Sequence, residues 1–138
     1  MKKFLASNKI YISQSKMPKA ERGVFARVDI KKGEIIERCP VIEVPKYDTS
    51  NLRESILVTY FFYFGRSKER LVVALGFGSI YDHSYKPNAM YRIKPEERLI
   101  DFIALKYIKK DDEITINYNH GSPKDKSPLW FDVSTPSE

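Results

Sequence analysis

The pattern of apolar and polar positions along the chain predicts many short strands and little helix. The segments that favour strands by alternation or by a short apolar run are residues 9–13, 22–30, 71–77 and 113–118. Residues 35–44 also favour a strand but contain Pro40. Because proline cannot donate to a ladder, this segment is expected to form two short strands or a bulged edge strand.

The remaining periodic segments complete a mostly β picture. Residues 89–93 and 98–105 flank the polar turn 94–97, which predicts a hairpin. Residues 52–64 are ambiguous and fit a segment that starts as a short helix and finishes extended. There is no alternation of strands with long helices, no repeat and no domain boundary. The pattern therefore predicts one mostly β domain built from small sheets.

The stretch from 74 to 91 is the least generic part of the chain. It combines small residues, which let backbone approach closely, with the polar tripeptide Asp82-His83-Ser84 and interleaved aromatic rings. A simple turn would not need this mixture. We interpret the stretch as the floor of a binding site.

Composition adds limits rather than a function. A length of 138 residues suits a single domain with its own core. The net charge of +6 favours acidic partners at long range, but the basic residues are spread along the chain and fit an ordinary surface. A lone cysteine, Cys39, excludes an internal disulfide and a multi-cysteine zinc site, and it is expected to be buried. With no long apolar run and no membrane segment, a soluble intracellular protein is expected, cytoplasmic or, in a eukaryote, nuclear.

Common catalytic patterns are absent from the sequence. There is no P-loop and no GxSxG motif, and adjacent residues such as His83 and Ser84 cannot act on one another as base and nucleophile. No ligand cluster predicts a metal. What remains is a high aromatic content of 9 Tyr, 8 Phe and 1 Trp. An aromatic site without acids or bases suits a cationic or apolar substrate.

Four segments, in order, carry a resemblance to the SET-domain protein lysine methyltransferases of the short stand-alone kind. They are ERGVFA followed by DIKKGEII (21–26 and 29–36), GSIYDHS continued by PNA (78–84 and 87–89), EITINY (113–118), and PLWF (128–131). Together they cover most of the chain. The resemblance implies a single SET domain over 1–138, with its core at about 20–120 and residues 121–138 closing the site.

The resemblance also implies a fold and an activity. SET domains are small curved β-sheets with a knot-like crossing near the C-terminus, and residues 76–79 are expected to approach the crossing strand. The implied reaction moves a methyl group from S-adenosylmethionine to the ε-amine of a lysine in a protein. Nucleic acid is not expected as the substrate, and a homodimer is a possible assembly because sheet edges need cover.

Individual positions take roles from the same resemblance. Tyr118 matches the active-site tyrosine, and Tyr91 matches a second catalytic tyrosine. The cofactor-binding positions that the resemblance implies are Ala20, Arg22, Gly23, Asp82, His83, Tyr118 and Trp130. The lysine channel that it implies is lined by Tyr60, Tyr91 and Phe131. Core packing is the alternative for Tyr60, and a hydrophobic plug is the alternative for Trp130.

One departure from the family pattern concerns the cofactor site. Asp82 stands where the family usually has Asn, so an acceptor is kept while the amide donor is lost. This substitution supports a second hypothesis, a non-catalytic SET-like module that binds protein. A third hypothesis, a basic β-domain that binds nucleic acid, rests on the net charge and predicts steeply salt-dependent binding.

Overall fold

A computed structural model describes residues 3–64, 70–119, 124 and 126. Its elements in chain order are β1 (Ile10–Gln14), β2 (Arg22–Ala26), β3 (Ile35–Val44), the 3-10 turn η1 (Lys46–Asp48), α1 (Thr49–Arg53), the 3-10 turn η2 (Ile56–Thr59), β4 (Phe61–Phe64), β5 (Arg70–Ala74), β6 (Asp82–His83), β7 (Ala89–Lys94), β8 (Leu99–Ala104) and β9 (Glu113–Ile116). The prediction of a mostly β fold with little helix is confirmed.

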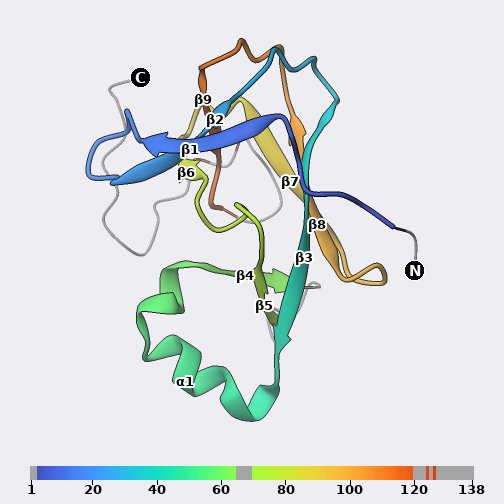
Figure 1. Ribbon diagram of the computed structural model, residues 1–138. Helices are drawn as coiled ribbons and strands as arrows, with labels where there is room; N and C mark the ends of the chain where they lie inside the picture. Colours follow the sequence, from blue (N-terminus) through green and yellow to red (C-terminus); the bar gives the residue numbers. More distant parts are fainter. Residues whose placement is uncertain (1–2, 65–69, 120–123, 125, 127–138) are drawn as a thin grey trace.

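The strands form two sheets. One has the order β1-β2-β9-β6 and the other the order β4-β5-β3-β8-β7. β3 is long and connects two ends of the molecule, with β1 and β2 near one end and α1 at the other (Figure 1). Its first part pairs with β8 and its second part with β5. β3 therefore links the segment that carries α1 to the motif-bearing segments.

Most strand predictions are confirmed, and two are corrected. The hairpin of β7 and β8 pairs in register across its turn. β3, however, runs through Pro40 as one interior strand, and its bulge lies earlier, between Ile35 and Glu37. β3 changes its partner from β8 to β5 directly after Pro40, and the Pro40 carbonyl accepts from the Leu75 N–H at 2.9 Å. β2 ends at Ala26, four residues before the predicted end.

The core lies between the two sheets and is mostly aliphatic. The residues with the largest fully buried side chains include Tyr81, Phe64, Phe102, Ile30 and Ile36. Cys39 is fully buried, as predicted, and burial raises the pKa of its thiol. Its neighbours explain the glycines of the stretch that precedes β6. A Cβ at Gly78 would lie 2.7 Å from Ala74 Cβ and 3.0 Å from Cys39 Sγ.

This packing corrects the expectation for residues 76–79. The nearest atoms to Gly76 and Gly78 belong to β3, β5 and β8. The contacts that a side chain at Gly76 or Gly78 would make are with Glu37, Cys39, Ala74 and Phe102. The small residues are needed because the loop lies directly on the core sheet.

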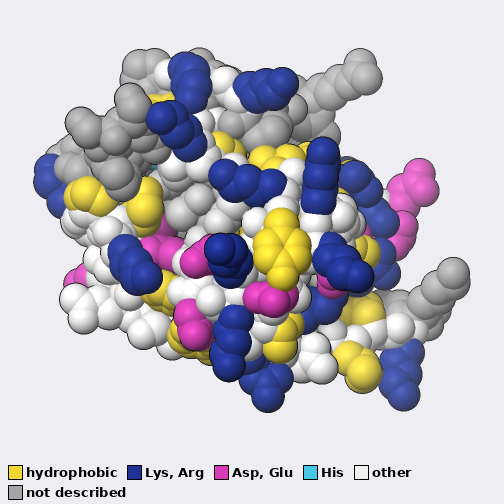
Figure 2. Space-filling model, turned by 90° about the horizontal axis from the view of Figure 1, so that it is seen from above, with side chains coloured by type: hydrophobic (Ala, Val, Ile, Leu, Met, Phe, Trp, Pro, Cys, Tyr) yellow, Lys and Arg dark blue, Asp and Glu magenta, His cyan; other side chains and the backbone are white. Residues whose placement is uncertain are grey.

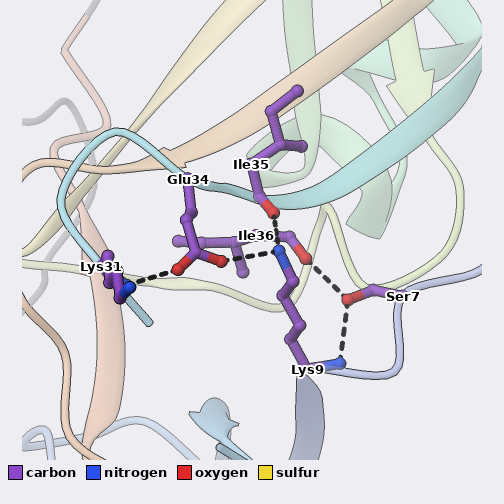
Figure 3. Close-up of polar contacts among 6 residues, drawn as sticks. All are labelled: Ser7, Lys9, Lys31, Glu34, Ile35 and Ile36. Atoms are coloured by element: carbon purple, nitrogen blue, oxygen red, sulfur yellow. Dashed lines mark hydrogen bonds and ion pairs between the residues drawn. The ribbon is translucent and has the colours of Figure 1, made fainter. Parts of the chain in front are cut away.

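The segment before β1 is attached to the start of β3 (Figure 3). Lys9 Nζ donates to Glu34 Oε2 at 3.0 Å and to the Ile35 carbonyl at 2.9 Å, and Ser7 Oγ donates to the Ile36 carbonyl at 2.6 Å. Glu34 also accepts from the Lys31 N–H at 2.9 Å and so closes the turn before β3. These bonds hold the first strand against the long strand that supports the rest of the fold.

Among the described residues, no helix is both long and apolar enough to cross a membrane. No group of three or more His, Cys, Asp and Glu side chains is arranged to hold a metal ion in that part of the chain. The face shown in Figure 2 carries Lys and Arg side chains spread over its area, with acidic and apolar side chains between them.

Candidate active site

Two motif-bearing segments, residues 82–84 and 113–118, lie side by side. β6 and β9 pair in parallel, with Asp82 opposite Thr115 and His83 opposite Ile116. The Ser84 N–H donates to the Ile116 carbonyl at 2.9 Å and extends this pairing. Segments about 30 residues apart in the sequence therefore form one continuous piece of the site.

Asn88 completes a crossing around β9. Its Nδ2 donates to the Glu113 carbonyl and its Oδ1 accepts from the Thr115 N–H, both at 2.9 Å. In an extended strand the backbone polar groups of successive residues point to opposite edges, so residues two apart share an edge. The groups of Glu113 and Thr115 thus face one edge, and the Ile116 carbonyl that bonds Ser84 faces the other. β9 passes between Ser84 and Asn88, which is the expected knot-like crossing.

Tyr118 follows β9 and is fixed at both ends against the crossing. Its N–H donates to His83 Nδ1 at 3.0 Å, and its hydroxyl donates to the Tyr81 carbonyl at 2.6 Å. Its ring lies 5.1 Å from the His83 ring. Burial raises the pKa of Tyr118, and the nearby charge of Asp82 raises it further. The hydroxyl therefore stays protonated and keeps donating to Tyr81.

Asp82 shares a partly buried corner with Glu113 and Gly23. A Cβ at Gly23 would collide with Glu113 Oε2 and would lie 2.9 Å from Asp82 Oδ2, so glycine at this position leaves room for both carboxyl groups. The Ser15 hydroxyl donates to Glu113 Oε2 at 2.6 Å, and the Lys16 N–H donates to Oε1 at 2.7 Å. The loop between β1 and β2 therefore holds Glu113 in place.

The carboxyl groups of Asp82 and Glu113 differ in the hydrogen bonds that they accept. Asp82 Oδ2 is buried and has no hydrogen-bond partner among the described residues. Burial raises the pKa of Asp82 to about 7, and the charge of Glu113 contributes to the rise. A buried carboxyl oxygen without a donor is costly, so this corner suits a ligand that brings an N–H donor or a positive charge.

Tyr91 and Tyr60 lie on the side of the site that faces β4. Tyr91 is half-buried in β7, and its ring meets the Phe62 ring edge-on at 5.1 Å. Burial raises the pKa of Tyr91 to about 12, so its hydroxyl also stays protonated. The Tyr60 carbonyl accepts from Ser79 Oγ at 3.3 Å, and Tyr60 is 39% exposed.

Two expected cofactor positions lie in the loop that ends at β2. Ala20 is half-buried, and its N–H donates to the Met17 carbonyl at 3.3 Å, while Arg22 is exposed at the start of β2. Gly23 follows directly and brings this loop to Asp82. Trp130 and Phe131 lie outside the described residues, so their expected roles stay predictions.

Comparison with known proteins identifies the family. Residues 21–119 match the SET domain family. The chain is 30% identical over 112 residues to the histone-lysine N-methyltransferase specific for histone H3 lysine-37 from Schizosaccharomyces pombe, a match that covers 80% of this chain and 70% of that protein. This protein therefore belongs to the SET domain family, whose named relative here is a lysine methyltransferase.

Solved structures agree with the assignment. A Plasmodium falciparum protein assigned as a histone methyltransferase has a TM-score of 0.64 and 36% identity, over 82% of this chain and 95% of that chain. The polycomb repressive complex 2 of Chaetomium thermophilum has a TM-score of 0.70 at 22% identity, over 96% of this chain and 18% of that chain. The second likeness concerns the fold alone.

The sequence analysis assigns no role to Glu113 or Ser15, the two residues beside Asp82. Glu113 belongs to a motif that carries the resemblance, but nothing in the sequence distinguishes its side chain from the other carboxyl groups of the chain. Ser15 lies in a polar loop with no motif at all. The one signal for both was Gly23, because a glycine at the start of a strand indicates that something approaches the backbone closely.

Proposed function

We propose that this protein transfers a methyl group from S-adenosylmethionine to the ε-amine of a lysine in a protein. The observation that carries the proposal is the position of Tyr118. Its hydroxyl is fixed to the Tyr81 carbonyl directly beside the Asp82–His83 segment. A tyrosine that is fixed through its backbone N–H and its hydroxyl, beside a partly buried polar corner, suits the orientation of two reactants.

The cofactor fits the corner at Asp82. In this proposal Ala20, Arg22, Gly23, Asp82, His83, Tyr118 and Trp130 hold it. Oδ2 of Asp82, which has no hydrogen-bond partner within the described part of the chain, would accept from the ammonium group of the cofactor. At neutral pH the raised pKa of about 7 leaves Asp82 partly protonated, so its carboxyl group also has the donor that an asparagine would offer. When bound, the cofactor supplies a methyl group activated by a positively charged sulfur.

The aromatic residues of this chain favour the neutral form of the substrate lysine. A lysine side chain in water has a pKa of about 10.4 and must lose a proton before its nitrogen can attack. In this proposal the half-buried rings of Tyr91 and Phe62, together with Tyr60, line a channel that excludes water when the lysine is bound and so disfavours the ammonium form. Because the Tyr118 hydroxyl proton is committed to the Tyr81 carbonyl, its lone pairs are left to accept from the amine or from polarised C–H groups.

The substrate class follows from the relatives. The S. pombe relative is named for lysine-37 of histone H3, so we propose histone H3 as the first substrate to test and a nuclear location in a eukaryotic host. A homodimer stays a prediction, since it follows only from the expectation that exposed sheet edges need cover.

Transfer of labelled methyl groups to histone H3 and to other lysine-rich proteins tests the proposal. Wild type should transfer the label, and Tyr118→Phe should lower the rate about 100-fold because it removes the oriented hydroxyl. Tyr107→Phe is the matched control, because Tyr107 is 52% exposed and bonds Asp29 away from the site. Label transfer that is unaffected by Tyr118→Phe would remove the role proposed for this tyrosine.

A second candidate function is a SET-like module that binds protein without catalysis. It is favoured by the carboxyl group of Asp82, which repels the carboxylate of the cofactor when ionised. Calorimetry with S-adenosylmethionine separates the two functions. Binding to wild type supports the enzyme, whereas absence of binding to both wild type and Asp82→Asn supports the module.

A further inference from the structure

The proposed chemistry does not use Glu37, an acidic residue near the start of β3 that is only 7% exposed. A carboxyl group removed from water needs hydrogen-bond donors. Both of its oxygens have one. The Tyr81 hydroxyl donates to Oε1 at 2.9 Å, and the Phe77 N–H donates to Oε2 at 2.9 Å.

Two backbone features place Glu37 in this position. The bulge between Ile35 and Glu37 shifts the register, so that Ile36 and Glu37 are both buried, which regular alternation would not give. Gly76 makes room on the other side, with φ of +65°, and a Cβ there would lie 2.5 Å from Glu37 Oε2. The strand and the loop are thus both shaped around this carboxyl group.

Tyr81 connects Glu37 to the candidate active site. Its hydroxyl is held by Glu37, and its ring stacks on Phe102 with centroids 4.4 Å apart and an interplanar angle of 17°. Its backbone carbonyl accepts the Tyr118 hydroxyl at 2.6 Å. The side chain of Tyr81 is therefore fixed at one end of the residue, and its carbonyl orients Tyr118 at the other.

We propose that Glu37 is a positioning residue for Tyr118 and acts through Tyr81. The inference rests on the proposed function, because it assigns a supporting residue to the tyrosine that is placed at the reacting groups. Glu37 bonds Tyr81 and the Phe77 N–H, and its influence on Tyr118 passes through the Tyr81 carbonyl. A shift of that carbonyl redirects the Tyr118 hydroxyl, and small misplacements of such groups are costly in rate.

Two variants break the connection in different ways. Glu37→Gln keeps the shape but places an amide donor against one of the two donors, so the Tyr81 hydroxyl or the Phe77 N–H loses its acceptor. Tyr81→Phe keeps the ring on Phe102 and removes only the hydroxyl. Glu43→Gln is the matched control, because Glu43 lies in the same strand and makes an exposed ion pair with Arg70 at 2.7 Å.

The first measurement is turnover in a double-mutant cycle. Glu37→Gln and Tyr81→Phe should each lower kcat about tenfold, with the KM for the cofactor unchanged. In the Tyr118→Phe background the same two substitutions should have little further effect, since the residue on which they act is already lost. Equal losses in both backgrounds would show that Glu37 only supports the fold, and the proposal would be wrong.

The second measurement does not need activity. In protein labelled with ¹³C at tyrosine Cζ, the signal of Tyr118 is assigned as the one missing from Tyr118→Phe. It should shift in Glu37→Gln and in Tyr81→Phe but not in Glu43→Gln. An unmoved signal in both site variants overturns the inference. A shifted signal in a protein that transfers no methyl group keeps the inference that Glu37 positions Tyr118 and rejects the proposed function.

Discussion

The crossing and the segment 46–60 lie in the same small domain and are built in opposite ways. At the crossing, β9 is bonded on both edges, and the polar residues His83, Thr115 and Asn117 are buried. In 46–60 the elements are short, and Leu52 is the one buried residue of the segment. Its large apolar side chains are exposed to solvent, to 86% at Tyr47 and 83% at Ile56.

The two regions therefore differ in how strongly hydrogen bonds and packing fix them. The crossing has several part-buried hydrogen bonds, which fix Tyr118 and the backbone on both edges of β9. The segment 46–60 has few buried contacts, which is typical of parts that open easily and contact partners. Substitutions should therefore lower the free energy of unfolding at the crossing and change it very little in the segment 46–60.

The largest effect is expected for Asn88→Ala. The variant leaves the Glu113 carbonyl and the Thr115 N–H without their partner, so the free energy of unfolding should fall by about 2–4 kcal/mol. The matched control is Asn51→Ala, because Asn51 donates to Asp48 at 2.7 Å on the exposed helix of the other segment. Urea unfolding of both variants measures the contrast, and equal losses would contradict it.

The next largest loss of stability is expected where a methyl group is added to the tightly packed loop before β6. In Gly78→Ala the new methyl group would lie 2.7 Å from Ala74 Cβ and 3.0 Å from Cys39 Sγ, two short side chains that cannot retreat. We expect a loss of about 2 kcal/mol from overpacking. Gly33→Ala is the control for backbone strain alone, with φ of +86° and open space around it, and should cost about 1 kcal/mol. Thermal unfolding of the two variants decides the order, and a larger loss for Gly33→Ala would contradict it.

The same contrast explains how much the sequence could predict. Most strands around the crossing follow from alternation, whereas the crossing itself is expected only from the resemblance to SET domains. Residues 52–64 stayed ambiguous because short helical turns with exposed apolar side chains have no consistent period. The sequence therefore predicted the strands around the crossing better than the short helical turns of the exposed segment.

Glu37 and Pro40 show what local patterns miss. Glu37 lies between Ile36 and Arg38 and looks like the solvent-facing residue of a strand. It is buried because a loop about 40 residues later covers it and supplies both of its donors. Pro40 predicted an edge or a break, but β3 changes its partner from β8 to β5 near this residue. Both facts depend on tertiary pairing that no local window contains.

A smaller effect, dependent on pH, is expected for Asp82→Asn. Because burial, with the charge of Glu113, raises the pKa of Asp82 to about 7, the folded state binds this proton more tightly than the unfolded state. Wild type should therefore lose stability as pH rises from about 4 to about 7. Asp82→Asn removes this loss.

The gain of Asp82→Asn over wild type should reach about 1 kcal/mol above pH 7, since partial exposure screens the charge. The groups that face Asp82 are Glu113 from β9, Ser15 from the β1–β2 loop and Tyr118. Urea unfolding at pH 5 and pH 8 measures the effect, and Asp48→Asn in the other segment is the control. A stability difference that does not change with pH would contradict the environment assigned to Asp82.

The smallest effect on stability is expected for Ile56→Ser. The side chain is 83% exposed, so the free energy of unfolding should change by less than about 0.5 kcal/mol. If the segment contacts the protein substrate, the KM for that substrate should rise severalfold while the cofactor KM stays the same. Leu5→Ser, at a site 73% exposed and outside the segment, is the control and should change neither constant. A destabilised Ile56→Ser would show that the segment is packed like the crossing, and an unchanged substrate KM would place recognition elsewhere on the domain.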